Sequence, residues 1–170
     1  MVLRTLVISV LLLFSIPSWA WIPDELDPVI VESNLSIRDM GRVVDLSEAF
    51  SQAAREHKPM FVYLDAEDCP MCRKYNRYII DNLARYQQLF KPYVVVDIRT
   101  TMNWIPQIFR IDGKDYSFDE FKQLVGDDNK FLTYPYFWIL GPDRKQLKQL
   151  PIGVFGNRDI EKHAEWLRIR

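Results

Sequence analysis

The sequence predicts an α/β fold in which a mixed central sheet is flanked by helices on both faces. Three observations support this fold class. Runs of β-branched and aromatic residues alternate along the chain with amphipathic segments of helical period. The first two long apolar runs enclose one helical segment, which is the order of a βαβ unit with parallel strands. The last two runs are joined by a short turn, which indicates an antiparallel hairpin.

The N-terminal half opens with a segment of irregular pattern. Residues 21–40 show no sustained period, and we expect an extended lead-in with a strand over Val29–Glu32. A β-like run ending at Asp45 is followed by an amphipathic segment. Because Asp45 and Glu48 have the spacing of a capping box, we expect a helix to begin there. Pro59 ends this helix, since proline does not continue one.

A βαβ unit is expected next. Met60–Leu64 are apolar throughout, as in a strand buried on both faces. The following segment repeats its apolar residues at helical spacing, and we expect it to break near Asp81 and to resume as far as Phe90. Tyr93–Ile98 are rich in β-branched residues and predict the second strand.

The C-terminal half predicts a helix, a hairpin and a final helix. A turn at Asp112–Gly113 precedes a helix over Ser117–Val125. Two strands are expected over Tyr134–Leu140 and Gln146–Phe155. Asn157 is placed to cap the last helix.

Size and composition are those of one globular domain. The chain has 170 residues, of which 48% are hydrophobic, enough to bury a core. The 22 basic and 23 acidic side chains nearly cancel, so no basic surface for nucleic acid or an anionic membrane is apparent. We expect no nucleic-acid partner.

The first twenty residues have the pattern of an export signal. Arg4 precedes an apolar run, Leu6–Ile16, and small residues lead to Ala20, after which we expect cleavage. Because this run is shorter than the roughly 20 residues that span a bilayer, we expect no membrane insertion of the mature chain; a retained anchor is the alternative. The predicted organisation is a signal peptide over 1–20, the lead-in over 21–40 and a folded domain over 41–170. The predicted location is the periplasm.

Both cysteines of the chain lie in one short stretch, Asp65–Cys72. If the preceding strand ends near Asp65, Cys69 is the N-cap of the next helix and Pro70 its first residue. The N–H groups and the dipole of the helix then favour a thiolate at Cys69, the expected nucleophile. Cys72 lies one turn further on, where it can resolve a mixed disulfide at Cys69. This chemistry requires a sulfur that solvent reaches.

Three other uses of the cysteine pair depend on which further ligands or constraints the chain supplies. A structural zinc site needs four ligands, and the chain adds only His57 and His163 to the two sulfurs. A copper site with Met71 or Met102 is chemically allowed but lacks a cluster of methionine or histidine. A purely structural disulfide in so small a loop constrains the unfolded chain little. We therefore favour a redox pair without metal or cofactor, while the alternatives remain open.

The sequence resembles the thioredoxin superfamily. Its Cys-X-X-Cys stretch at a strand-to-helix junction is followed later by Pro135 at the start of a hairpin, preceded by Tyr134. The order of the turn, the helix Ser117–Leu124 and Tyr134–Pro135 looks like that of periplasmic SoxW-like thioredoxin-related proteins. Gly153 or Gly156 would match a glycine that follows the last strand in many members. The resemblance implies a thioredoxin-like fold.

The resemblance also implies the roles of six residues. The expected catalytic residues are Cys69, Cys72 and Pro135, and the expected substrate contacts are Pro70, Met71 and Tyr134. In the family the proline is cis and packs against the active-site disulfide. For Tyr134 three interpretations stay open: it shields Cys69, it stacks on a substrate, or it is a wall of the core.

Two departures from the family concern the surroundings of the cysteines. Asp68 stands where most thioredoxins have tryptophan before the first cysteine, and Tyr63 stands where many have a buried acid that moves protons. The proton-transfer role is therefore open to Asp65, to Glu67 or to water.

The function that the residues and the resemblance predict is that of a periplasmic thiol–disulfide oxidoreductase. It would reduce or exchange disulfides in exported proteins, and the resemblance implies a membrane electron donor. Because Met71 has neither charge nor N–H donor to stabilise the thiolate, we expect a reducing or intermediate potential. The alternatives are an oxidase of the DsbA kind and a non-catalytic module that binds a client or copper.

Overall fold

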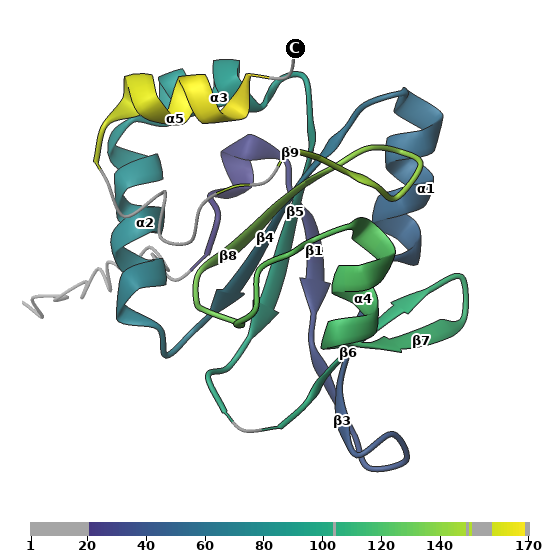
Figure 1. The fold of residues 1–170 in the computed structure, drawn as a ribbon. Helices are drawn as coiled ribbons and strands as arrows, with labels where there is room; N and C mark the ends of the chain where they lie inside the picture. Colours follow the sequence, from purple (N-terminus) through teal and green to yellow (C-terminus); the bar gives the residue numbers. More distant parts are fainter. Residues whose placement is uncertain (1–20, 104, 149, 151–157, 169–170) are drawn as a thin grey trace, which may run out of the picture.

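A computed structural model describes residues 21–168 except for 104, 149 and 151–157. The predicted signal peptide therefore lies outside the described residues. Five strands form the central sheet in the order β1, β5, β4, β8, β9 (Figure 1). Their bounds are Val29–Glu32 (β1), Met60–Ala66 (β4), Val94–Thr100 (β5), Tyr136–Leu140 (β8) and Gln146–Lys148 (β9).

The pairing of these strands confirms a mixed sheet. β1, β5 and β4 run parallel, whereas β8 is antiparallel to β4 and β9 is antiparallel to β8. The predicted βαβ unit is therefore present. The strand expected at Val29–Glu32 is also present, and it forms an edge of the central sheet, so the segment 21–40 takes part in the sheet through β1.

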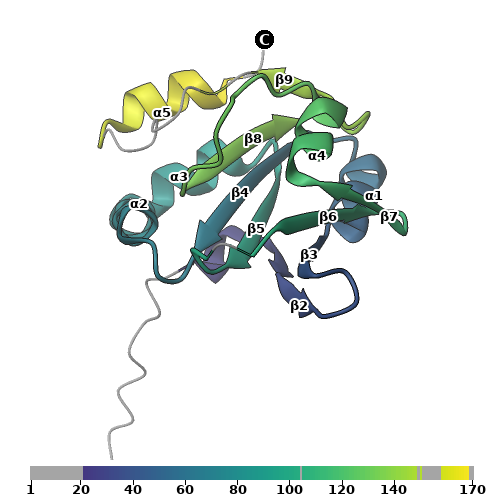
Figure 2. The ribbon, with the colours of Figure 1, turned by 60° about the horizontal axis from the view of Figure 1, so that its bottom comes forward.

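Helices cover both faces of the central sheet, as predicted. In Figures 1 and 2, α1 and α4 lie on one side, and α2, α3 and α5 on the other. β4 is buried throughout because it serves both cores: Leu64 belongs to the core beneath α1 and α4, and its neighbour Tyr63 to the core beneath α2, α3 and α5. Within the described ranges no helix has the length and apolar character to cross a membrane. The helices span Asp24–Leu26 (η1, a 3₁₀ turn), Ser47–Glu56 (α1), Pro70–Asp81 (α2), Leu83–Phe90 (α3), Phe118–Val125 (α4) and Ile160–Leu167 (α5).

A second sheet, with strand order β2, β3, β6, β7, was not predicted. Only β3 matches an expected strand. The missed hairpin of β6 and β7 turns at Asp112 and Gly113, whose φ angles are 52° and 77°. Two consecutive residues with positive φ are typical of the tight hairpin turn that Asp-Gly favours, so the signal was present in the sequence. The bounds are Asn34–Ser36 (β2), Gly41–Asp45 (β3), Gln107–Ile111 (β6) and Lys114–Ser117 (β7).

The capping box predicted for the first helix is wrong. Asp45 is still the last residue of β3, in register with Arg110 of β6, so α1 begins only at Ser47. The carboxylate of Asp45 accepts hydrogen bonds from the backbone N–H of Ser47 at 3.0 Å and from its hydroxyl at 2.6 Å. Glu48 instead pairs with Arg55. Because Asp45 is held in the strand by this pairing, the helix begins later in the chain than its sequence pattern predicts.

The last predicted elements are partly outside the described residues. β9 begins at Gln146 as expected, but the predicted strand continued to Phe155, and residues 149 and 151–157 are not described. Asn157, Gly153 and Gly156 lie in this gap. The N-cap of α5 is Asp159, whose carboxylate accepts hydrogen bonds from the N–H groups of Glu161 and Lys162.

The start of α4 offers a test of local stability. Ser117 is its N-cap, and Ser117 and Glu120 form a reciprocal capping box. Replacing Ser117→Ala is expected to lower the free energy of unfolding by about 1 kcal/mol, because helix N–H groups lose their acceptor. Urea unfolding measures this. The control Ser51→Ala, at an exposed position inside α1, should cost nothing; equal midpoints for the two variants contradict the assignment.

Candidate active site

The two cysteines occupy the junction between β4 and α2. β4 ends at Ala66, and Cys69 has an extended backbone, with φ −87° and ψ 111°, as the N-cap of α2. Pro70 is the first helical residue, where its missing N–H has no cost. The sulfur of Cys69 accepts a hydrogen bond from the backbone N–H of Cys72 at 3.0 Å. The predicted N-cap geometry is therefore confirmed.

The two sulfurs are joined in a disulfide and buried. Cys69 is 1% exposed and Cys72 is 0% exposed, so the expectation of a sulfur reached by solvent is wrong for this form of the protein. The reason is tertiary: the two residues form a small apolar cluster with Ala66, and Tyr134 packs against that cluster.

Tyr134 contacts the cysteine cluster from just before β8, and Pro135 lies between it and the strand. The peptide bond between them is cis. The next residue, Tyr136, is paired with Leu64 near the end of β4, which places the loop beside the junction that holds the cysteines. The contact of Tyr134 with the cysteine cluster supports shielding, and its packing against the main core supports the interpretation as a wall of the core, so both remain open.

The hydroxyl of Tyr134 lies in a charged environment. Burial raises the pKa of Tyr134 to about 12, with a further increase from the negative charge of Asp68 and a smaller opposing effect from Arg42. The ring therefore stays neutral at physiological pH. Arg42 belongs to β3, so the unpredicted second sheet reaches the surroundings of the disulfide.

The end of β5 connects the second sheet to the loop that precedes Cys69. The side chain of Gln107, in β6, donates to the hydroxyl of Thr100 at 3.2 Å. The carbonyl of Thr100 accepts from the backbone N–H of Glu67 at 3.0 Å. The carboxylate of Asp68 accepts from the backbone N–H of Met102 at 2.7 Å. Two of these bonds tie the loop before Cys69, at Glu67 and Asp68, to the end of β5.

Apolar side chains remain exposed around this junction. Met71, between the cysteines, is 46% exposed, and Met102 is 47% exposed. Phe131, in the same loop as Tyr134, is 70% exposed and was not singled out from the sequence. Pro70 is also exposed. Contiguous exposed apolar side chains are typical of surfaces that contact other proteins, whereas single exposed ones are common on any surface.

A buried carboxylate lies on the strand that leads to the cysteines. Asp65 is 0% exposed, and one carboxylate oxygen accepts from the side-chain amide of Asn76 at 2.6 Å, the other from the N–H of Ala66 at 2.6 Å. Asn76 is one turn beyond Cys72 on the same face of α2. Burial raises the pKa of Asp65 to about 7 against the opposing effect of the Asn76 bond. Asp65 is therefore poised to exchange a proton near neutral pH.

A second buried carboxylate belongs to β5 and was missed by sequence reasoning. Asp97 is 0% exposed, and burial raises its pKa to about 6, opposed by a hydrogen bond from Arg99 at 2.9 Å. The sequence did carry a signal for it, because Asp97 interrupts a run of β-branched residues that predicts a buried strand. Glu67, the other proton-transfer candidate, is exposed, and Tyr63 is a core residue stacked on Phe137.

The residues weighed as metal ligands lie on different elements. His57 is exposed at the end of α1, whereas His163 is buried in α5 with its Nδ1 atom against the hydroxyl of Tyr86. In the part of the chain that the structure describes, no group of three or more histidine, cysteine, aspartate or glutamate side chains is placed to hold a metal ion.

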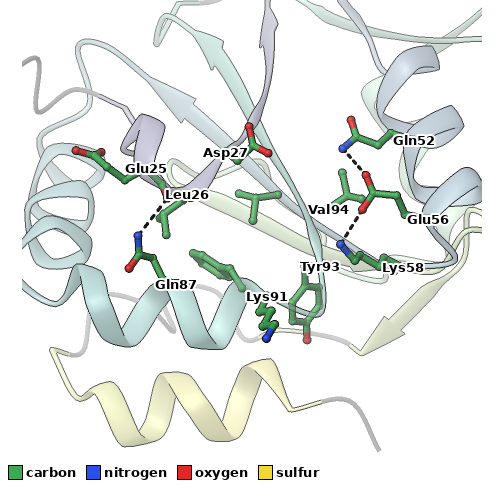
Figure 3. Close-up of a pocket in the computed structure, with 12 residues that line it drawn as sticks. Glu25, Leu26, Asp27, Gln52, Glu56, Lys58, Gln87, Lys91, Tyr93 and Val94 are labelled. Carbon is green, nitrogen blue, oxygen red and sulfur yellow. Dashed lines mark hydrogen bonds and ion pairs between the residues drawn. The ribbon is translucent and has the colours of Figure 1, made fainter.

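A cavity of about 300 Å³ lies away from the disulfide (Figure 3). It is lined by Val94 at the start of β5 and by Lys58, which precedes β4, whereas Cys69 follows the other end of β4. The carboxylate of Glu56 accepts hydrogen bonds from Lys58 at 2.7 Å and from Gln52 at 2.8 Å in its wall. The cavity and the candidate active site are therefore separate.

Comparison with known proteins agrees with this geometry. The profile of a family described as thioredoxin-like matches residues 40–142. A search of curated proteins gave no match. The matched region is more than half of the chain and contains the βαβ unit, both cysteines and the cis-proline loop. The closer resemblance to SoxW-like proteins stays a prediction. The chain belongs to the thioredoxin-like family.

Proposed function

We propose that this chain is a thiol–disulfide oxidoreductase that reduces or exchanges disulfides in exported proteins of the periplasm. One observation carries the proposal: the cysteine pair lies at the N-terminus of α2, with the cis-proline loop packed on it. The N–H of Cys72 points at the sulfur of Cys69, and with the helix dipole it favours a thiolate there once the pair is reduced.

The reaction begins with the reduced pair. The Cys69 thiolate attacks one sulfur of a client disulfide, so that a mixed disulfide forms and the other client sulfur leaves as a thiolate. The Cys72 thiolate then attacks the sulfur of Cys69, which restores the Cys69–Cys72 disulfide and releases the second client sulfur. Two electrons pass from the enzyme to the client. A membrane electron donor, expected from the family, returns two electrons and two protons.

The second step needs a base, because Cys72 is buried and attacks only as a thiolate. Asp65 supports this role. Its pKa of about 7 allows it to hold or accept a proton at neutral pH, and Asn76 links it to the helix face that carries Cys72. Glu67 is a weaker choice because it is exposed.

Tyr134 adds a condition to the cycle. In the disulfide form it packs on the sulfurs, so a reducing thiol reaches Cys69 only when the Tyr134 side chain moves away. The burial of both sulfurs is also the observation that favours the main alternative, a non-catalytic module that holds a client. The two functions differ in whether a mixed disulfide forms.

A redox titration tests the direction of the reaction. The protein is equilibrated in glutathione buffers, and the fraction of the Cys69–Cys72 disulfide is measured by thiol alkylation. Because Met71 offers no charge or donor to the thiolate, we expect a potential below about −150 mV, toward the reducing or middle part of the family range. A higher value makes the protein an oxidase.

A further inference from the structure

The segment between α4 and β8 carries the tyrosine that packs on the cysteine cluster. It runs from Asp127 to Pro135 and contains both Phe131 and Tyr134. The segment forms no helix and no strand, so regular backbone hydrogen bonds do not position it. Its place over the cysteines therefore depends on side-chain contacts: Leu132 packs on the core, and the two ends are attached as follows.

The first end is attached by a buried carboxylate. Asp127 is 7% exposed, and one of its oxygens accepts hydrogen bonds from the hydroxyl of Tyr136 at 2.6 Å and from the indole N–H of Trp138 at 2.8 Å. Its other oxygen accepts from the backbone N–H of Asn129 at 2.9 Å. One side chain thus joins the start of the segment to the strand at its end.

The strand that donates these bonds, β8, is buried and fully paired. Trp138 is fully buried, and β8 is paired with β4 along its whole length. Burial and the charge of Asp127 raise the pKa of Tyr136, so its hydroxyl stays protonated as a donor. Tyr136 directly follows Pro135, and the bond from Asp127 therefore acts next to the residues that cover the disulfide.

We propose that Asp127 is a positioning residue that holds Tyr134 over the Cys69–Cys72 disulfide and so limits the rate at which thiols reach it. This inference rests on the proposed function. Without the carboxylate, the segment loses the bonds that Tyr136 and Trp138 donate to Asp127. The bond between Asn129 and Tyr136 and the packing of Leu132 on the core remain, but the start of the segment is held less firmly, and Tyr134 leaves the cysteine cluster more often. The oxidised protein is then reduced faster by any thiol that must pass this side chain.

The test is a double-mutant cycle on the reduction of the disulfide by dithiothreitol, measured by alkylation of the cysteines at 25 °C. Tyr134→Ala removes the cover and is expected to speed reduction about tenfold. Asp127→Asn, which retains an acceptor oxygen, should speed it less, and Asp127→Ala should approach the Tyr134→Ala rate. In the double variant Asp127→Ala with Tyr134→Ala, the rate should equal that of Tyr134→Ala alone.

Two controls separate positioning from general loosening of the fold, and a further variant replaces Asp127→Ala if it does not fold. Asp128→Asn changes the exposed neighbour of Asp127 and should react like the wild type. Ser117→Ala weakens α4 without touching the segment and should also leave the rate unchanged. If Asp127→Ala does not fold, Tyr136→Phe removes one donor to the same carboxylate and should speed reduction to a smaller degree.

The outcomes distinguish this inference from the proposed function. The positioning role is overturned if the rate increases of the two single variants multiply in the double variant. It is also overturned if Asp127→Ala is reduced at the wild-type rate. A wild-type rate for Tyr134→Ala overturns it too, because Tyr134 is then no barrier. Failure to reduce a protein disulfide overturns the proposed function instead, since the dithiothreitol reaction needs no client.

Discussion

Cys69→Ser is expected to bring the dithiothreitol-driven reduction of insulin down to the uncatalysed rate. A serine hydroxyl is not ionised at neutral pH and forms no disulfide, so the first step is lost. The fold should be retained, because serine is a preferred N-cap and can accept the N–H bond that the sulfur of Cys69 now receives. The turbidity of precipitating insulin measures the rate, and equal curves for variant and wild type remove the enzymatic proposal.

Cys72→Ser is the matched variant for this experiment. It retains the nucleophile but lacks the sulfur that resolves the mixed disulfide, so turnover stops while a covalent adduct with the client accumulates. Non-reducing gels detect the adduct, and its absence in Cys69→Ser with Cys72→Ser serves as the blank. If Cys72→Ser traps no client, the non-catalytic binding module is the better assignment.

The second large effect concerns the pH dependence of stability. Burial raises the pKa of Asp65 from 3.8 to about 7 in the folded protein. Between about pH 4 and pH 7 the folded protein therefore holds a proton that the unfolded chain has released, so stability is highest at the acid end and falls as pH rises. A shift of about three pKa units corresponds to about 4 kcal/mol at most.

Asp65→Asn is expected to remove most of this loss. At pH 8 the variant should be more stable than the wild type by up to about 4 kcal/mol, because no buried charge remains at this position, whereas near pH 4 the two should be similar. The pKa of Asp97 is also raised, to about 6, so the stability of the variant should still fall with rising pH, but less steeply than that of the wild type. Urea unfolding from pH 4 to pH 8 measures the difference.

Glu67, an exposed carboxylate close to Asp65 in the sequence, provides the control for the stability measurements on Asp65→Asn. Glu67→Gln removes a carboxylate two residues away without removing a buried charge, so its stability should follow the wild type at each pH. If Asp65→Asn is no more stable than the wild type at pH 8, the buried carboxylate is not a source of the pH dependence. Loss of insulin reduction in Asp65→Asn at full stability would support its role as the base.

Local signals predicted the parts of the fold that are long and regular. The run Met60–Leu64 and the helical period after Pro70 were found because each is repeated over several residues. β2, β6 and β7 were missed because they are short and carry polar residues, so their strand character depends on pairing. The start of α1 was misplaced because Asp45 remains paired with Arg110.

The chain itself specified the chemistry at the helix start. A cysteine followed by proline, at the point where an apolar run ends and a helical period begins, makes Cys69 an N-cap, and that outcome depends only on neighbouring residues. Three contacts join residues that are separated in sequence: Tyr134 packs on the cysteine cluster, Asn76 donates to the buried Asp65, and Trp138 donates to Asp127. No periodicity or residue spacing in the sequence predicts such contacts, because they form only when separate elements pack together. They are therefore known only from the tertiary structure.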